Sequence, residues 1–255
     1  MRNSVLITGA NRGIGLALAR HYAALDWEVV ATARQPDAAG ELQALPAGSA
    51  RVEIVPLDLT SPASRQALAE WLAGRPLDIL LHNAALLGDP APQEFGRLDY
   101  SLFHDSLETN LVGPIHLSEL LLDNLQQGRQ RKLVFLGSAA GSHGLLGPGL
   151  KLYAYRASKA ALHFAVHELA GDLASRGITV GLLNPGLVDT QGVLDRAPGE
   201  PVPRAFQPLL PLIESGELEL LRPAEAAARI ATLIASLGPE QAGRFINVDG
   251  SELPW

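Results

Sequence analysis

Cysteine is absent from the 255 residues of this sequence, which excludes disulfide bonds, thiolate chemistry and cysteine-ligated zinc. A surplus of basic residues is absent too, because 20 Lys and Arg stand against 27 Asp and Glu, for a formal net charge of -7. A protein with this balance has no basic face to hold nucleic acid or an anionic membrane. We therefore expect neither as a partner.

Long apolar runs and internal divisions are also missing. The apolar run in the opening MRNSVLITGA is only a few residues long and ends in Gly, which is too short for a signal peptide or a membrane-spanning helix. Nothing resembling a linker or a repeat interrupts the chain, and a hydrophobic fraction of 47% is ample for a buried core. The sequence thus predicts one soluble, cytoplasmic domain over residues 1–255.

Short β-branched segments alternate with longer Ala- and Leu-rich amphipathic segments, a pattern that predicts parallel strands joined by right-handed crossover helices. The expected strands are residues 4–8, 28–33, 51–57, 78–82, 132–137, 178–184 and 244–248. We therefore predict an α/β fold, a Rossmann-type doubly wound sheet of seven parallel strands with helices on both faces. Ligands bind such sheets at the carboxyl ends of the strands, so the residues that follow each strand are candidates for function.

The segment TGANRGIG follows the first expected strand and places Gly9, Gly13 and Gly15 at the start of a helix. Without a Cβ, the backbone can turn tightly and approach a pyrophosphate, whose charge the helix N-terminus would meet. The spacing Gly-x-x-x-Gly-x-Gly is weak evidence alone, since an ordinary strand-to-helix turn also uses glycine. Its position after the first strand of an α/β chain favours dinucleotide binding.

The second expected strand ends in ATAR, where an acidic residue would bind the adenosine ribose of NAD. Ala33 cannot do so, whereas Arg34 and Arg12 could bracket a ribose 2'-phosphate. We therefore prefer NADP(H), with NAD(H) possible if the arginines are only solvated surface residues. After the third strand, Asp58 could accept from the adenine amino group or could simply neighbour a helix N-cap.

In YAYRASKAAL, Tyr155 and Lys159 are four residues apart, so on a helix the phenol and the ammonium share one face. Such a pair also occurs by chance in amphipathic helices. Lys151 is equally spaced from Tyr155, but it follows GLLGPGL, which predicts a loop.

Two further strands end in candidate residues, Asn83 in HNAAL and Ser138 in GSAAGS. A serine hydrolase is disfavoured because no Gly-x-Ser-x-Gly elbow surrounds Ser138. Pro114 lies four residues after Asn110 in ETNLVGPIHLSELLL and has no N–H, so the Asn110 carbonyl loses its helical partner. We expect a kink there, with a carbonyl free to hold a water, although an incidental kink is the alternative.

With TGANRGIG, HNAA, Asn110, Ser138, YRASK and NPGLVDT in this order, the chain resembles the short-chain dehydrogenases/reductases over nearly its whole length. ATARQP, YAYRASKAAL and the ending DGSELPW are most similar to the sniffer and C-factor group of carbonyl-reductase-like proteins. The resemblance implies that Tyr155 is the general acid/base and that Lys159 binds the nicotinamide ribose and lowers the pKa of Tyr155. It also implies that Ser138 holds the substrate oxygen and that Asn110 anchors a relay water.

The same resemblance implies a small carbonyl or alcohol substrate and a homodimer or homotetramer. The residues expected at the coenzyme are Gly9, Asn11, Arg12, Gly13, Ile14, Gly15, Arg34, Asp58, Leu59, Asn83, Ala84, Tyr155, Lys159, Pro185, Gly186, Val188 and Thr190. No metal is expected. His163 and His167 have a spacing that suits zinc, but no third ligand is evident. We expect them to serve helix packing, which could include the subunit interface that the resemblance implies for this helix.

Two segments depart from the family pattern or lie outside its motifs. His82, Asn83, Ala84 and Ala85 stand where the family usually has Asn-Asn-Ala-Gly, and the gap between Ser138 and Tyr155 is lengthened by SHGLLGPGLKL. Residues 187–221 are expected to cover the substrate, with prolines that limit the open ensemble and glycines that act as hinges. These residues are Pro198, Pro201, Pro203, Pro208, Pro211, Gly186, Gly192 and Gly199.

Three functions fit these motifs. The preferred one is an NADP(H)-dependent carbonyl reductase with Tyr155 as the proton donor. The alternatives are an NAD-linked alcohol dehydrogenase and a C-factor-like dinucleotide-binding signalling protein without relevant turnover. The complete set of Asn110, Ser138, Tyr155 and Lys159 argues against the last, because a pure binder needs neither the serine nor the phenol.

Overall fold

The seven strands expected from the sequence form one sheet in which all neighbouring strands are parallel. A computed structural model describes residues 2–45, 51–89, 93–145, 151–197 and 199–255. The strands are β1 (Ser4–Ile7), β2 (Glu28–Ala33), β3 (Val52–Pro56), β4 (Ile79–His82), β5 (Lys132–Leu136), β6 (Thr179–Asn184) and β9 (Phe245–Asn247). Their order is β3-β2-β1-β4-β5-β6-β9, so the strand order reverses between β1 and β4. The predicted doubly wound Rossmann-type fold is confirmed.

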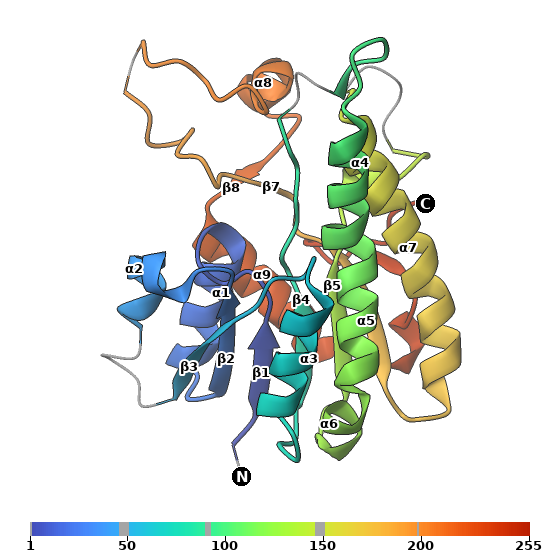
Figure 1. Ribbon diagram of the computed structural model, residues 1–255. Helices are drawn as coiled ribbons and strands as arrows, with labels where there is room; N and C mark the ends of the chain where they lie inside the picture. Colours follow the sequence, from blue (N-terminus) through green and yellow to red (C-terminus); the bar gives the residue numbers. More distant parts are fainter. Residues whose placement is uncertain (1, 46–50, 90–92, 146–150, 198) are drawn as a thin grey trace.

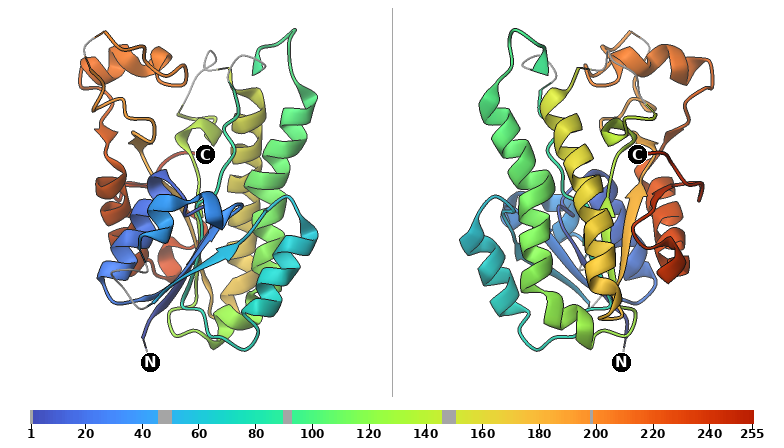
Figure 2. Two further views of the ribbon diagram at one scale, coloured as in Figure 1. Left: turned by 60° about the vertical axis from the view of Figure 1, so that its left-hand side comes forward. Right: turned by 90° about the vertical axis from the view of Figure 1, so that its right-hand side faces the viewer.

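Helices cover both faces of the sheet, as Figure 1 and Figure 2 show. One face carries α1 (Gly13–Ala24), α2 (Gly40–Gln43) and α9 (Pro223–Ser236). The other carries α3 (Pro62–Trp71), α5 (Gly113–Leu120), α6 (Leu122–Gln127) and α7 (Tyr153–Ala174), with α4 (Tyr100–Leu107) packed on α7. Short 3-10 turns occupy Pro36–Ala38, Ala139–Gly141, Gln207–Leu209 and Pro239–Gln241.

The core lies in two layers because successive strand residues point to opposite faces. In β1, Val5 and Ile7 belong to the apolar cluster beneath α1 and α9, whereas Leu6 belongs to the cluster beneath α3, α5 and α7. All three are fully buried. This two-sided packing holds the carboxyl edge of the sheet, where the candidate site residues lie.

The helix interruption expected near Pro114 takes the form of a π-helical turn, Glu108–Val112, between α4 and α5. The Gly113 amide donates to the Glu108 carbonyl, five residues back, because Pro114 offers no N–H to Asn110. The turn also presses α5 close to the loop after β3. A Cβ on Gly113 would collide with the Leu59 carbonyl oxygen.

The expected substrate-covering segment is joined at its base by a pair of strands that the sequence did not predict. Leu187–Val188 (β7) pairs in parallel with Leu220–Leu221 (β8), and α8 (Leu210–Glu214) lies between them along the chain. Figure 1 shows this orange segment above the carboxyl edge of the sheet, at the top of the view, which is also the end of the molecule where α4 and α7 begin. Pro198 and residues 146–150 of the lengthened Ser138–Tyr155 gap lie outside the described residues. In the described part of the chain, no helix is long and apolar enough to span a membrane.

Candidate active site

The glycine loop leaves β1 at the carboxyl edge of the sheet and runs directly into α1. Gly9 has a φ of +67°, and a Cβ there would lie 2.8 Å from the Cβ of Ala84. A Cβ on Gly15 would collide with the Gly9 carbonyl oxygen and with the Asn83 side-chain amide. Neither position accepts a side chain, so glycine is what allows the loop to lie against β4.

The N-cap side chain of α1 does not cap the N-terminus of the helix. Arg12 is the N-cap residue, in an extended conformation, and its side chain makes no capping hydrogen bond. The first turn contains Gly13, Ile14 and Gly15 and no acidic residue. First-turn amides have no acceptor within a helix and carry partial positive charge, so this end of α1 fits the pyrophosphate of a dinucleotide. Asn11, just before the N-cap, is exposed.

Asn83 and Thr8 tie the glycine loop to the end of β4. The Asn83 side-chain amide donates to the carbonyls of Thr8 and Gly9, at 2.9 and 3.0 Å. In return, the buried Thr8 hydroxyl accepts from the amides of Asn83 and Ala84, each at 3.1 Å. Asn83 therefore acts here through the loop backbone. His82, which precedes it, points into the core and stacks on Phe135 at 4.7 Å.

The residues expected at the adenosine end follow β2 and β3 at the same sheet edge. Ala33 is buried at the end of β2, whereas Arg34 and Arg12 are exposed. Within the described residues, neither arginine forms an ion pair. The Oδ1 atom of Asp58 accepts from the amide and hydroxyl of Thr60, at 2.9 and 2.8 Å. Asp58 thus stabilises the turn that leads to Ser61, the N-cap residue of α3, which is the structural alternative considered for it.

The segment after β6 is shaped by Asp189, a buried residue that the sequence analysis did not include. Pro185 and Gly186 are half-buried, Val188 is buried in β7, and Thr190 is exposed beside Gly13, where a Cβ would lie 3.0 Å from its Cγ2. Burial acts to raise the pKa of Asp189. The amides of residues 191, 193 and 194 donate to its carboxylate and bring that pKa below its usual value. The carboxylate thereby fixes the turn that carries Thr190.

Tyr155 and Ser138 meet at the carboxyl edge, one from the first turn of α7 and the other from the end of β5. Burial raises the pKa of the Tyr155 phenol, and its hydrogen bond with the Ser138 hydroxyl lowers it by less. The Ser138 hydroxyl also accepts from the Ala140 amide at 3.2 Å. The net shift from the protein groups is opposite to the lowering that the resemblance implied, because burial disfavours the charged phenolate.

Lys159 is 2% exposed, and its ammonium donates to the Leu136 carbonyl at 2.8 Å. Burial lowers the pKa of Lys159 to about 8. The Nζ atom lies 5.9 Å from the centre of the Tyr155 ring. The expected pair therefore shares one face of α7, with the ammonium held at the end of β5.

Asn110 holds α7 to the loop after β4 rather than pointing freely into the site. Its Oδ1 accepts from the Leu86 amide at 2.7 Å, and its Nδ2 donates to the Leu86 carbonyl at 3.0 Å and to the Ser158 hydroxyl at 2.9 Å. Ser158 in turn donates to the Tyr155 carbonyl at 2.8 Å. These bonds use Nδ2 as a double donor and Oδ1 as a single acceptor, which favours the Asn110 backbone carbonyl in the π-helical turn as the group that would hold a relay water.

The two α7 histidines both pack against other parts of the chain, as expected, and a subunit contact at this helix stays a prediction. His163 is 2% exposed and packs inside the chain, 4.3 Å from the Phe245 ring and 6.0 Å from the Trp255 ring. His167 is exposed and lies edge-on to Trp255 at 5.5 Å. Among the described residues, no cluster of three or more His, Asp or Glu side chains could hold a metal.

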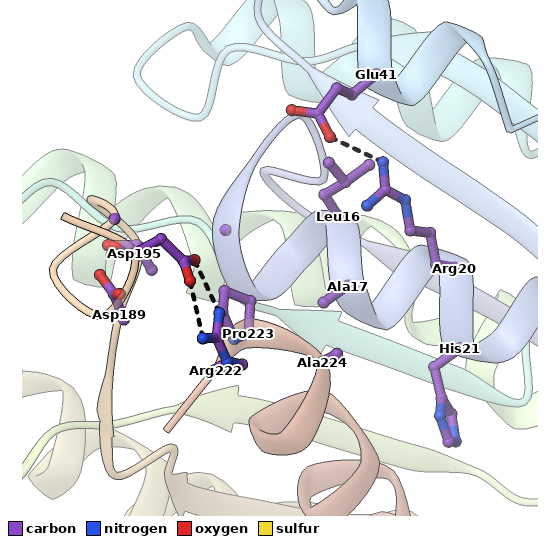
Figure 3. A pocket seen from close by; sticks show the side chains of 13 residues that line it. Leu16, Ala17, Arg20, His21, Glu41, Asp189, Asp195, Arg222, Pro223 and Ala224 are labelled. Carbon is purple, nitrogen blue, oxygen red and sulfur yellow. Dashed lines mark hydrogen bonds and ion pairs between the residues drawn. The ribbon is translucent and has the colours of Figure 1, made fainter. Parts of the chain in front are cut away.

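A groove of about 640 Å³ lies beside the glycine loop, between α1 and the start of α9. Figure 3 shows two ion pairs along it, Arg20 with Glu41 and Arg222 with Asp195. None of the four expected catalytic residues lines this groove. Its wall includes the base of the 187–221 segment, which the paired Arg222 and Asp195 tie to the start of α9.

Several site residues escaped the sequence analysis because their partners are distant along the chain. Thr8 and Ser158 belong to the quoted motifs TGANRGIG and YRASK, so their positions were a signal. Asn184 accepts from the Ala139 amide at 3.0 Å and precedes the Pro-Gly turn. Gln93, which accepts from the Tyr155 amide at 3.3 Å, carries no such signal.

Comparison with known proteins gives consistent matches. Residues 3–200 match the family model described as short chain dehydrogenase. The NADPH-bound carbonyl reductase from chicken fatty liver is 29% identical, with a TM-score of 0.83 and 100% of both chains covered. The carbonyl reductase Sniffer of D. melanogaster is 28% identical, with a TM-score of 0.81 and the same coverage. C-signal of Myxococcus xanthus is 30% identical over 191 residues, or 74% of this chain and 99% of that protein.

Proposed function

The chain belongs to the short-chain dehydrogenase family of oxidoreductases, and on that premise we propose that it reduces a carbonyl compound to an alcohol with NADPH, using Tyr155 as the proton donor. The likeness to the sniffer and C-factor group that the motifs indicated is confirmed by the matches to Sniffer and to C-signal. The observation that carries the proposal is the Ser138–Tyr155 hydrogen bond beside the buried Lys159 ammonium. Acid, hydrogen-bond donor and cation thus converge at the ligand-binding edge of a dinucleotide-binding sheet.

The proposed proton transfer uses the chain's own groups in a simple order. Bound NADPH supplies the hydride, and its oxidised form supplies a positive charge that favours the phenolate of Tyr155. The Ser138 hydroxyl orients the substrate oxygen, and the Tyr155 phenol donates its proton to that oxygen. Lys159 would contact the nicotinamide ribose and stabilise the phenolate that remains. The Asn110 carbonyl would hold the water that returns a proton.

The residues that would hold the dinucleotide fit it. The uncapped N-terminus of α1 accepts the pyrophosphate, and the tight turn at Gly9 permits its approach. Arg12 and Arg34 are exposed cations without ion pairs in the described part of the chain, and Ala33 offers no carboxylate to a ribose hydroxyl. These features favour NADPH over NADH.

The 187–221 segment is proposed as the cover of the substrate. Its base is fixed, because β7 pairs with β8, the Asp189 amide donates to the Leu221 carbonyl at 2.9 Å, and Arg222 binds Asp195 through two bonds of 2.8 Å. Arg229 on α9 also binds Glu219, so the part that could close is narrower than expected and lies within residues 199–218. The alternative is a fixed surface excursion or an oligomer contact.

We also infer that two or four copies of the chain associate through the outer side of α4 and α7. Tyr100 on α4 is 70% exposed and Phe164 on α7 is 69% exposed, and α4 packs on α7. Large exposed aromatic side chains on one packed helix pair support a protein contact.

An NADPH oxidation assay across a panel of aldehydes and ketones tests the proposed function. Tyr155→Phe should reduce the rate by at least about a hundredfold, because it removes only the transferable proton, while NADPH affinity stays within about twofold. Tyr153→Phe is the matched control, since Tyr153 lies two residues earlier on the same helix and is 43% exposed.

The alternatives give different results in the same assay. Oxidation of alcohols with NAD, without NADPH-dependent reduction, would support the NAD-linked dehydrogenase. Dinucleotide binding without turnover of any carbonyl would support the signalling protein. A Tyr155→Phe rate within tenfold of the unmodified protein would contradict the role of Tyr155.

A further inference from the structure

We propose that His163 is a positioning residue that holds Ser138 in place, and that the Trp255 ring helps to hold His163 by lying edge-on to it. The inference rests on the proposed function, because only there is Ser138 assigned to the substrate oxygen. Among the described residues, the His163 side chain makes no hydrogen bond to Tyr155 or to an expected coenzyme residue, so its role would be exerted through Ser138.

The contact is a backbone hydrogen bond to a buried ring. The Ser138 amide donates to Nε2 of His163 at 3.3 Å, and His163 lies 25 residues further along the chain, on the second turn of α7 after Tyr155. The chain leaving β5 wraps tightly around this ring. A Cβ on Gly137 would lie 2.9 Å from Nε2, and one on Gly141 would lie 2.9 Å from Cε1.

The protonation state of His163 suits this bond. Because Nε2 accepts a hydrogen bond, it carries a lone pair, and the neutral ring must hold its proton on Nδ1. Burial, with a smaller effect from the charge of Lys159 on the same helix, lowers the pKa of His163 to about 4. The ring is therefore neutral near pH 7 and can accept from Ser138. If Nε2 were protonated, its N–H would face the N–H of Ser138, and this hydrogen bond could not form.

Residues 253–255 close the other side of the His163 ring. The chain turns back along β9, where the Leu253 amide donates to the Phe245 carbonyl at 2.8 Å, and the rings of Phe245 and Trp255 both lie against His163. The same segment binds the loop that follows Ser138. The Ser142 hydroxyl donates to the Pro254 carbonyl at 2.6 Å, and the Gly144 amide donates to the backbone oxygen of Trp255 at 2.9 Å.

His163 affects the Tyr155 phenol through the Ser138 hydroxyl. Ser138 is held on its amide by His163, and its hydroxyl is bonded to Tyr155, where it acts to lower the pKa of the phenol. Removing the acceptor on His163 leaves the part-buried Ser138 amide without this partner, which favours a shift of the backbone toward another acceptor. A shifted Ser138 would orient the substrate oxygen less well and would lower the pKa of Tyr155 less.

The test compares His163→Leu with His163→Gln, whose side-chain oxygen can replace Nε2 as the acceptor. His167→Leu is the matched control, because His167 lies one turn away against the same Trp255 ring and has no contact with Ser138. Loss of one such hydrogen bond corresponds to about tenfold in rate, so His163→Leu should lower kcat about tenfold at unchanged NADPH affinity. His163→Gln should recover most of that loss, and His167→Leu should show none.

Two further readouts separate positioning from general destabilisation. In a Ser138→Ala background, His163→Leu should cause little additional loss, because the group it positions is already gone. The alkaline limb of the reduction, where Tyr155 loses its proton, should move to higher pH in His163→Leu. An equal loss in both backgrounds, with the limb unmoved, would overturn the inference.

A measurement without turnover keeps this result distinct from the proposed function. The 13C resonance of Tyr155 Cζ, assigned by its disappearance in Tyr155→Phe, can be followed against pH in the full chain. His163→Leu should raise the pKa of Tyr155, and His163→Gln should restore it. An unchanged titration would refute the positioning role even if the chain proved to reduce no carbonyl in the panel.

Discussion

Replacing Lys159 by methionine should abolish turnover and at the same time stabilise the folded chain near pH 7. Lys159 is 2% exposed, and burial has lowered its pKa from 10.5 to about 8. At neutral pH the folded chain therefore holds an ammonium in a place that favours the neutral amine. Methionine fills similar space without a charge, so it removes this cost together with the proposed ribose contact.

The size of the effect follows from the pKa and from one hydrogen bond. A pKa lowered from 10.5 to about 8 corresponds to about 3 kcal/mol of destabilisation when the group is charged. Methionine also leaves the Leu136 carbonyl without the donor that Lys159 provides, which costs about 1 kcal/mol. The free energy of unfolding should therefore rise by about 2 kcal/mol at pH 7.

The pH dependence gives the prediction its sign. For a base with a lowered folded-state pKa, the cost is complete below pH 8 and disappears as the pH rises from 8 to 10.5, because the unfolded chain then binds more protons than the folded one. The advantage of Lys159→Met should thus shrink over that window and end as a small disadvantage.

Urea unfolding of both proteins at pH 7 and at pH 10 measures this difference directly. Lys151→Met is the matched control, because Lys151 is exposed and pairs with Glu94 at the surface, so its removal should bring no gain at pH 7. A Lys159→Met variant that is less stable than the unmodified chain at pH 7, or a difference that ignores pH, would refute the reasoning.

Two other predictions concern the coenzyme and the covering segment. If Arg12 and Arg34 each bind the 2'-phosphate, NADPH should bind at least about tenfold more tightly than NADH in a fluorescence titration. Ala33→Asp should narrow or invert this ratio of affinities. Equal affinities in the unmodified protein would contradict the arginine contacts. Trypsin should cleave after the exposed Arg204 in the free protein and much less with NADPH and a substrate analogue bound, while cleavage after Arg129, at the opposite sheet edge, stays constant. No change at Arg204 would contradict closure.

The sheet could be predicted from the sequence because each of its strands carries a local signal. The ends of the apolar, β-branched segments lie within a residue or so of the ends of the observed strands. Their alternation with amphipathic helices predicted that the strands run parallel. The pair formed by β7 and β8 had no such signal. Each strand has only two residues, and their pairing depends on contacts across the whole intervening segment.

The candidate site was predictable to the same extent, where its residues are close in the sequence. Helical spacing alone placed Tyr155 and Lys159 on one face, whereas their expected roles came from the family resemblance, and the glycine loop follows from its place after β1. The hydrogen bonds that support the site could not be predicted in this way. Asn110 reaches Ser158 across 48 residues and Asn83 reaches Thr8 across 75, and only the folded sheet brings them together.

Burial changes the pKa values of both groups that share one face of α7, the Tyr155 phenol and the Lys159 ammonium. It acts on both groups toward their neutral forms, raising the pKa of Tyr155 and lowering that of Lys159. In the proposed reduction Tyr155 would begin as the neutral phenol, and its raised pKa would keep the transferable proton in place. In an alcohol oxidation it must begin as phenolate, which the same burial opposes. In the proposed reduction, the Lys159 charge and the Ser138 hydroxyl would therefore matter most after the proton has left, when they would stabilise the phenolate that remains.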